Sequence, residues 1–165
     1  MTFSIRLRVV ELGLTLPPPP TPRGIYSSLV IHQDVAYVSG QVSRADDMTI
    51  TGPVDDRTSS ETITTAAQAC VLRALSILAE AEDHAASVER ILFLRGFINA
   101  VPAFQNHSQV LDEASSLLHR IFGERGQHAR SAIGVNSLPN GGLMEIELTV
   151  ALSTAPRLSP TLFEH

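Results

Sequence analysis

The feature that most constrains the fold is a pair of alternating apolar runs near the C-terminal end of the chain. Residues 131–135 and 143–152 alternate apolar and polar side chains, and residues 138–142 between them read Leu-Pro-Asn-Gly-Gly. Alternation with a period of two indicates β-strands with one buried face, and Pro, Asn and Gly favour a turn. The chain must therefore build a sheet that includes these two successive strands.

Two longer segments show helical periodicity instead. Thr58-Ser59-Ser60-Glu61 reads as a capping box, and apolar residues then recur at helical spacing up to about residue 81. A second such series covers residues 110–122 and is stopped by Gly123. The apolar run at residues 91–100 between them predicts a strand covered on both faces.

Shorter elements precede the first helix. Residues 28–32 and 35–38 predict two strands with Asp34 in the turn between them, the second closing at Gly40. Residues 44–57 are a polar loop with a short strand at about 48–51. Residues 5–14 form either a short helix or an irregular segment, and the prolines at 17–20 form a stiff spacer because proline lacks an amide donor.

This order of elements predicts an α+β fold, a mixed β-sheet with two helices packed on one face. The length of 165 residues fits a single domain, residues 1–165, with a proline-rich N-terminal lead-in at residues 1–23. Because the helices cover only one face, the other face of an apolar sheet predicts self-association.

The charged residues exclude several classes of function. All 12 basic residues are Arg, and the formal net charge is -5. The absence of Lys excludes a lysine Schiff base, a pyridoxal phosphate lysine and a phosphate-loop lysine. Nonspecific nucleic-acid binding depends on clustered positive charge, so we predict no nucleic-acid partner.

Cysteine and histidine give no sign of a metal site. The single cysteine, Cys70, falls in the apolar helical pattern and is interpreted as a core residue. The six histidines are scattered without an i, i+4 pair, so we predict no metal and no cofactor. No apolar run approaches the length that spans a bilayer, and the N-terminus lacks a secretory signal. We therefore expect a cytoplasmic protein with no membrane partner.

A charged side chain stands at the start of each C-terminal strand. Arg130 precedes the first, and Glu145 lies near the start of the second with Glu147 on the same face. An Arg side chain can hold a carboxylate by two parallel hydrogen bonds, and a nearby carboxylate can accept a proton or orient a water. These residues outline a site for a small acid. The alternative is a structural ion pair between Arg130 and a neighbouring Glu.

Several short motifs occur in a fixed order along the chain. Val-Ser-Gly-Gln at 38–41, with Tyr26 upstream, precedes Arg-Ser-Ala-Ile-Gly-Val at 130–135, Leu-Pro at 138–139 and Glu-Ile-Glu at 145–147. The lead-in at 14–18 and the segment 122–130 complete the set. Together they resemble the RidA family of enamine/imine deaminases, also called YjgF, YER057c, UK114 or endoribonuclease L-PSP. The resemblance covers about residues 11–152 and is strongest to the long, chorismate-mutase-like branch.

This resemblance implies the chorismate-mutase-like, RidA-type fold and a homotrimer with its sites in the clefts between subunits. In such a site Arg130 would clamp the substrate carboxylate, and Glu145 would orient or activate the attacking water. Ser39 and Gly40 would contact the substrate from the cleft wall. Tyr26 would close the pocket from the adjoining subunit.

Ala132 is a further candidate substrate contact, at a position where short family members commonly carry Cys. The resemblance implies hydrolytic deamination of small 2-imino or enamino acids to 2-keto acids and ammonia, as in a 2-iminobutanoate/2-iminopropanoate deaminase-like hydrolase. The expected partner is a small carboxylate-bearing imine, enamine or keto acid. Two alternatives stay open: noncatalytic binding of small carboxylates or metabolites, and endoribonuclease activity, against which the acidic charge argues. Chorismate mutase activity is a fold-level analogy only.

Overall fold

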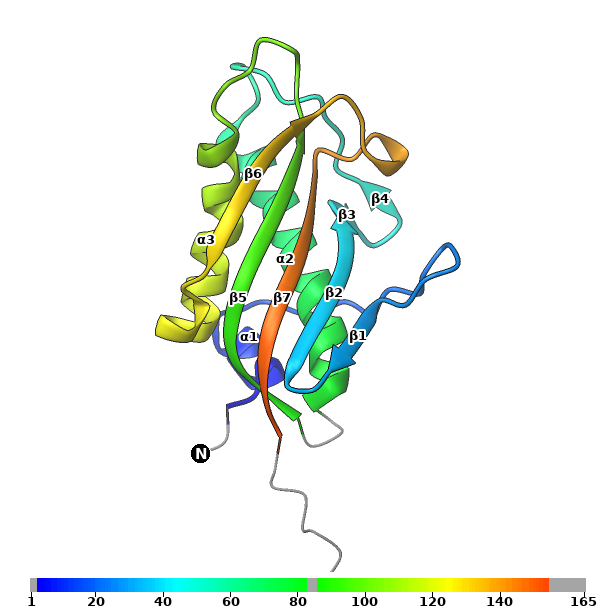
Figure 1. The fold of residues 1–165 in the computed structure, drawn as a ribbon. Coiled ribbons are helices and arrows are strands. Elements are labelled where there is room, and N and C mark those ends of the chain that lie inside the picture. Colours follow the sequence, from blue (N-terminus) through cyan, green and yellow to red (C-terminus); the bar gives the residue numbers. More distant parts are fainter. Residues whose placement is uncertain (1–2, 83–85, 155–165) are drawn as a thin grey trace, which may run out of the picture.

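The computed structural model describes residues 3–82 and 86–154 and contains a five-stranded sheet with helices on one face (Figure 1). This confirms the predicted α+β fold with a mixed sheet. In chain order the elements are α1 (Ile5–Glu11), β1 (Leu29–His32), β2 (Val35–Val42), β3 (Arg44–Ala45), β4 (Met48–Thr49), α2 (Ser60–Glu82), β5 (Ala86–Asn99), α3 (His107–Phe122), η1 (Gly123–Gly126), β6 (Ala129–Val135), η2 (Pro139–Gly141) and β7 (Met144–Thr154).

Strand β5 separates the two C-terminal strands. The sheet order is β1-β2-β7-β5-β6, with β5 and β6 parallel and the other pairs antiparallel. Strands β6 and β7 are successive in the chain, as predicted, but they are not neighbours in the sheet. Arg130 of β6 pairs with Leu94, whereas Glu145 of β7 pairs with Phe97. Because paired residues place their side chains on the same face, this register decides which C-terminal side chains can meet.

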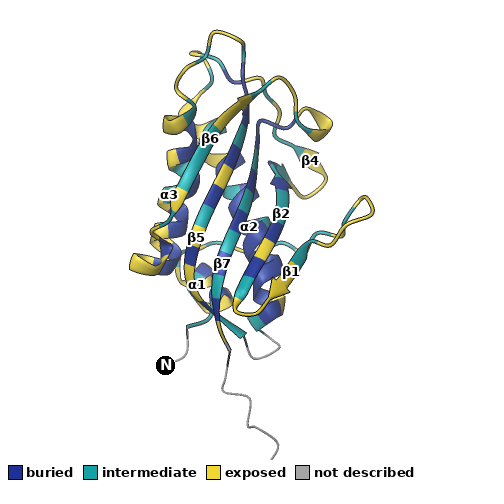
Figure 2. Ribbon diagram, in the orientation of Figure 1, coloured by how far each residue is buried: buried dark blue, intermediate teal, exposed yellow. Residues whose placement is uncertain are grey.

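The hydrophobic core lies between the sheet and helices α2 and α3. Leu94 and Ile98 of β5 and Ile146 of β7 are fully buried there. At Gly96 an added Cβ would lie 3.0 Å from Cγ of Leu111, so α3 packs directly on the backbone of β5. Figure 2 shows buried and more exposed residues alternating along β5 and β7, as the strand period of two requires.

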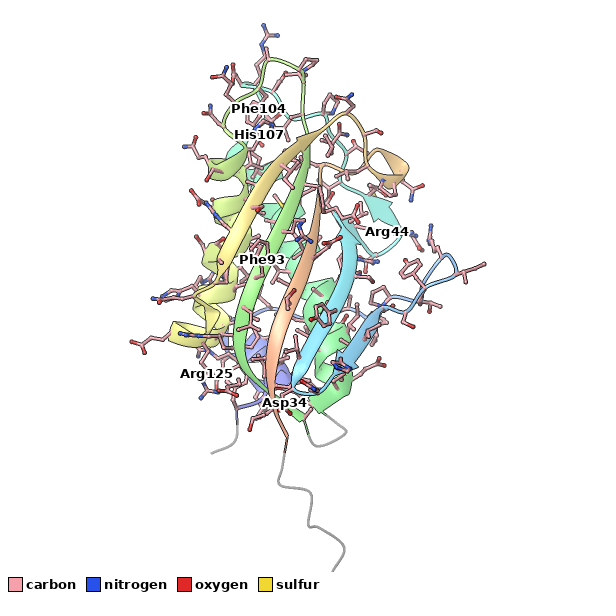
Figure 3. The ribbon with its side chains drawn as sticks, in the orientation of Figure 1. Asp34, Arg44, Phe93, Phe104, His107 and Arg125 are labelled. Carbon is pink, nitrogen blue, oxygen red and sulfur yellow. The ribbon has the colours of Figure 1, made fainter. Side chains whose placement is uncertain are left out.

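The other face of the sheet carries no helix within the described ranges. Tyr37, Thr149 and Phe93 form a cross-strand row on it, and Tyr37 is 52% exposed. The guanidinium of Arg95 lies 5.4 Å from the ring centroid of Phe93, which Figure 3 labels. Nη1 of Arg95 pairs with Oε2 of Glu147 at 2.6 Å. Self-association through this face stays a prediction.

Helix α2 begins one residue later than the predicted capping box places it. Oγ of Ser59 accepts a hydrogen bond from the amide of Thr62 at 3.1 Å, so Ser59 caps the helix. The Thr58 hydroxyl instead donates to Oδ1 of Asp55 at 3.1 Å. The predicted capping box, with Thr58 as the capping residue and Glu61 three residues later, was therefore wrong by one position.

Helix α2 is also long and apolar enough to cross a membrane by length and composition, contrary to the expectation that no run would be. Of its most apolar window, 67% is buried inside the fold. That burial is the pattern of a core helix, which can be apolar on nearly all sides.

The N-terminal lead-in crosses the helical layer before it enters the sheet (Figure 1). Helix α1 realises the first of the two options predicted for residues 5–14, and the Ile5 amide donates to Oε2 of Glu82 at 2.9 Å. Strands β6 and β7 extend two residues beyond their predicted bounds, β6 beginning at Ala129 and β7 ending at Thr154. Strands β2 and β5 extend further, since β2 continues to Val42 and β5 begins at Ala86. Both gain pairing with β7 over the added length.

Candidate functional site

A cavity of about 240 Å³ lies beside the end of β2 that β1 does not cover. At Ser39-Gly40 a bulge shifts the register of β2 against β7 and leaves this edge open. A cavity of this volume suits a small metabolite. Its walls come from the lead-in, the bulge, the β3–β4 hairpin, α2 and η2, and the lining residues are Pro20, Thr21, Pro22, Arg23, Tyr26, Ser28, Gly40, Gln41, Val42, Arg44, Thr49, Arg73, Pro139, Asn140 and Glu145.

Glu145 reaches this cavity over the backbone of Gly40. Its chain neighbours Met144 and Ile146 are buried toward the helices, so the Glu145 side chain lies on the other face of β7. A Cβ at Gly40 would lie 2.8 Å from Cδ of Glu145 and would overlap Oε1. The missing side chain at position 40 therefore provides the space that the carboxyl group occupies.

The Glu145 carboxyl group is half-buried. Burial raises its pKa, and the negative charge of Glu147 raises that pKa further. Glu147 is paired with Arg95, whereas Glu145 makes no salt bridge within the described part of the chain. A carboxyl group with a raised pKa beside a cavity can take a proton from a bound water and return it.

Three guanidinium groups line the same cavity, from Arg23 in the lead-in, Arg44 in β3 and Arg73 in α2. Nη2 of Arg44 pairs with the exposed Asp47 at 3.3 Å. Arg23 and Arg73 make no salt bridge to residues that the structure describes. Burial lowers the pKa of the Arg73 guanidinium, with a smaller contribution from Arg44 and Arg23, but an Arg side chain stays charged at neutral pH.

Two buried polar atoms of lining residues have no hydrogen-bond partner among the described residues: Nε of Arg73 and Oε1 of Gln41. Gln41 is only 4% exposed, and its Nε2 donates to the carbonyl of Ser39 at 3.1 Å. An unpaired buried polar atom costs about 1–3 kcal/mol, so nearly all such atoms in proteins are paired. An unpaired donor and an unpaired acceptor around one cavity indicate a site that a polar ligand or a water completes.

Three of the predicted site residues line this cavity within one subunit: Tyr26, Gly40 and Glu145. Tyr26 lines the cavity of its own chain, and its implied role of closing the pocket of an adjoining subunit stays a prediction. Ser39 lies beside the cavity, and its hydroxyl donates to the carbonyl of Ser28 at 3.3 Å.

Arg130 and Ala132 lie on the opposite face of the sheet, toward α3. Nη2 of Arg130 pairs with Oδ1 of Asp112 at 2.6 Å and bonds to Oγ of Ser108 at 2.8 Å, while Nη1 donates to Oγ of Ser115 at 2.9 Å. Arg130 and Glu145 therefore do not meet within one subunit. An ion pair is present, as the structural alternative predicted, but its acid is Asp112 rather than a Glu.

Cys70 is fully buried, as predicted for a core residue, and its thiol donates to the carbonyl of Met144 at 3.4 Å. Burial raises the pKa of this thiol, which disfavours the reactive thiolate. Within residues 3–82 and 86–154 no group of three or more His, Cys, Asp and Glu side chains is placed to hold a metal ion.

The three cavity arginines and Gln41 were not predicted from the sequence as site residues. One signal for Arg73 was present, because it stands between Leu72 and Ala74 in a helix that is otherwise apolar at this point. A charge inside an apolar helical pattern needs a partner or a cavity.

The fold and the cavity define a mixed-sheet α+β protein with a metabolite-sized site at a β-bulge. Residues 18–152 match the family model described as Endoribonuclease L-PSP. The chain belongs to this family, which is the RidA/YjgF family of the sequence analysis.

Three relatives illustrate the match. Protein TCP17 of Trypanosoma cruzi is 36% identical over 148 residues, which are 87% of this chain and 91% of that protein. The solved structure of Atu1372 from Agrobacterium tumefaciens, a protein of unknown function, is 31% identical with a TM-score of 0.80, covering 90% of this chain and 92% of that one. A "putative endoribonuclease" from Shewanella oneidensis is 26% identical with a TM-score of 0.81, covering 90% of this chain and 99% of that one.

Proposed function

We propose that this protein hydrolyses small 2-imino or enamino acids to 2-keto acids and ammonia in the cavity beside Glu145. The observation that carries the proposal is the Glu145 carboxyl group, which is half-buried, has a raised pKa and lines a metabolite-sized cavity. Membership of the family supports it, since the motifs that resemble the enamine/imine deaminases include Glu145, Gly40 and Tyr26.

The reaction consumes one water, and both protons of that water end on the nitrogen. Glu145 accepts a proton from the water while the water oxygen attacks the imine carbon, and it returns this proton to the nitrogen, which gives a neutral carbinolamine. Glu145 then accepts the carbinolamine hydroxyl proton and delivers it to the amino nitrogen, so that the C–N bond breaks, ammonia leaves, the keto group forms and the carboxylate is regenerated. General acid/base catalysis of this kind contributes about 10²–10⁴-fold, and the imine carbon is already electrophilic. The unpaired Oε1 of Gln41 offers an acceptor for the imine N–H or the water.

Arg130 enters this proposal from a neighbouring copy of the chain. Within one subunit it lies on the other face of the sheet from Glu145, so it can clamp a substrate at Glu145 only across a subunit boundary. The substrate carboxylate would then replace or share the contact that Nη2 makes with Asp112. The homotrimer implied by the resemblance provides such a boundary, and the partly exposed apolar side chains on the open face support self-association.

Noncatalytic binding of small carboxylates is a second candidate. It is favoured by the hydrogen bonds that hold Arg130 to α3 and by Ala132, which offers no polar contact where short family members carry Cys. A binder would show affinity for keto acids without accelerating their formation.

A coupled assay separates the two candidates. An amino-acid oxidase generates 2-iminobutanoate, and 2-oxobutanoate appearance is followed with and without the protein. The proposed function predicts acceleration that Glu145→Gln lowers by about a hundredfold or more and that Glu147→Gln, the matched change on the same face, retains. A protein that binds 2-oxobutanoate but leaves the rate at its spontaneous value would refute the deaminase proposal in favour of the binder.

A further inference from the structure

The cavity beside Glu145 holds more positive charge than one carboxylate balances. Arg23, Arg44 and Arg73 approach it from three separate elements, and Glu145 is the acidic residue that lines it. Asp47, which pairs with Arg44, is fully exposed and does not line the cavity. Like charges in a partly buried site repel one another, and water screens them less than it does on an open surface. Three converging guanidinium groups therefore favour occupancy by an anion.

Of these three arginines, Arg73 has the most fixed position, because it belongs to the core helix α2. It extends from the middle of α2, between the buried residues Leu72 and Ala74, and its Nε has no hydrogen-bond partner among the described residues. Partial burial of a guanidinium is costly unless an acceptor pairs with it. Arg130 is an example of an arginine whose donors are paired within the protein, because Asp112 and serine hydroxyls accept its hydrogen bonds. The buried Nε of Arg73, by contrast, has no acceptor among the described residues and is available to a ligand.

We infer that Arg73, with Arg44 and Arg23 beside it, binds a second anionic group of the ligand, so that the substrate carries a distal carboxylate or phosphate besides the carboxylate next to its imine carbon. The inference rests on the proposed function, because it assigns the second charge to the substrate of that reaction. Arg73 extends from α2 and Arg130 from β6, and in this assignment they hold different groups. The substrate class is then the 2-imino acids whose side chain ends in an anion.

The test is a binding measurement on the full chain by isothermal titration calorimetry at constant ionic strength. The probes are 2-oxobutanoate, which lacks a distal charge, 2-oxoglutarate, which has a distal carboxylate, and 3-phosphonooxypyruvate, which has a distal phosphate. The wild-type chain should bind one of the last two at least about tenfold more tightly than 2-oxobutanoate, the scale of one charge-assisted hydrogen bond.

Arg73→Ala should remove this preference and leave the affinity for 2-oxobutanoate unchanged. Arg57→Ala, a matched change at an exposed Arg that does not line the cavity, should leave all three affinities unchanged. Because Arg73 is partly buried, Arg44→Ala in the short β3–β4 hairpin is a second variant and should reduce the preference at least about threefold. The melting temperature of Arg73→Ala should equal or exceed that of the wild type, since the change removes an unpaired charge.

Equal affinity of the wild-type chain for the three probes would overturn the inference. So would an Arg73→Ala chain that loses 2-oxobutanoate as strongly as the doubly charged probes, because Arg73 would then hold the first carboxylate. A preference confined to 3-phosphonooxypyruvate supports a phosphate, and one confined to 2-oxoglutarate supports a carboxylate. Binding requires no turnover, so a flat coupled assay with the preference intact would remove the proposed reaction and support the anion site. Acceleration of 2-iminobutanoate hydrolysis with equal affinity for the three probes would support the proposed reaction and remove the anion site.

Discussion

Gly40→Ala is the change that most directly tests the placement of the Glu145 carboxyl group. The added Cβ would lie 2.8 Å from Cδ of Glu145 and closer to Oε1. Nonbonded carbons keep about 3.5–4.0 Å apart, so the carboxyl carbon must move by about 1 Å. The obstructing atoms are the end of a flexible side chain, and therefore the carboxyl group rather than the backbone gives way.

A catalytic group misplaced by about 1 Å loses about a hundredfold in rate, and we expect that loss in kcat/KM for 2-iminobutanoate. Stability should hardly change. The backbone of Gly40 is outside the left-handed region, so Ala can adopt it, and the smaller entropy of the unfolded chain stabilises by about 0.4–1 kcal/mol. For a domain of this size that corresponds to a melting temperature within about 4 °C of the wild type.

The assay is the coupled oxidase measurement on wild type, Gly40→Ala, Glu145→Gln and the double variant, with melting temperatures on the same samples. If Gly40 acts only through the carboxyl group, Gly40→Ala should cost nothing further in the Glu145→Gln background. An unchanged kcat/KM in folded Gly40→Ala, or an equal loss in both backgrounds, would refute the reasoning.

Five other outcomes are expected. Glu145→Gln should lower turnover by about a hundredfold or more while ligand affinity persists. The pKa of Glu145 is raised in the folded state, so the folded protein binds this proton more tightly and wild-type stability falls as pH rises through that pKa. By denaturant titration, Glu145→Gln should therefore be more stable than the wild type at pH 7. The two proteins should be equally stable below the pKa that Glu145 has in the unfolded chain. Arg130→Lys should lose kcat/KM for small imino acids nearly as severely as Arg130→Ala, about a hundredfold, because lysine lacks the planar guanidinium that binds a carboxylate by two hydrogen bonds. An unchanged keto-acid affinity in folded Arg130→Ala would show that Arg130 does not hold the substrate carboxylate. Light scattering should give three times the chain mass, and a monomer at micromolar concentration would contradict the trimer. RNA should show no salt-dependent binding, and a clear loss of RNA affinity as salt is raised would contradict this expectation.

Local periodicity was sufficient to predict the elements but not the faces that their residues share. The period of two correctly places Glu145 and Glu147 on one face of β7, where the negative charge of Glu147 raises the pKa of Glu145. Local periodicity does not predict that β5 lies between β6 and β7 in the sheet. Arg130 therefore faces α3 through its pairing with Leu94, a consequence of sheet order that no short motif contains.

Residues whose role depends on distant partners were likewise beyond local analysis. Arg73 would be a solvated residue on an amphipathic helix if the lead-in did not cross α2 and bring Arg23 and Tyr26 beside it. The first residues of β5, from Ala86, are too polar for a strand pattern and become one by pairing with the end of β7 at Thr154. The family match supplied the positions of Gly40 and Glu145, and the overlap of a Cβ with the carboxyl group gives the physical reason for the glycine.

Strand β7 reaches the centre of the sheet from the end of the described chain, and this has a consequence during synthesis. Val35 of β2 pairs with Ala151, so the second edge of β2 is covered only after residue 151 has left the ribosome. Until then both β2 and β5 present an open edge, and open edges pair readily with strands of other nascent chains. Glu145 arrives with the strand that closes them. A chain interrupted before β7 is therefore both prone to aggregate and without the carboxyl group of the cavity.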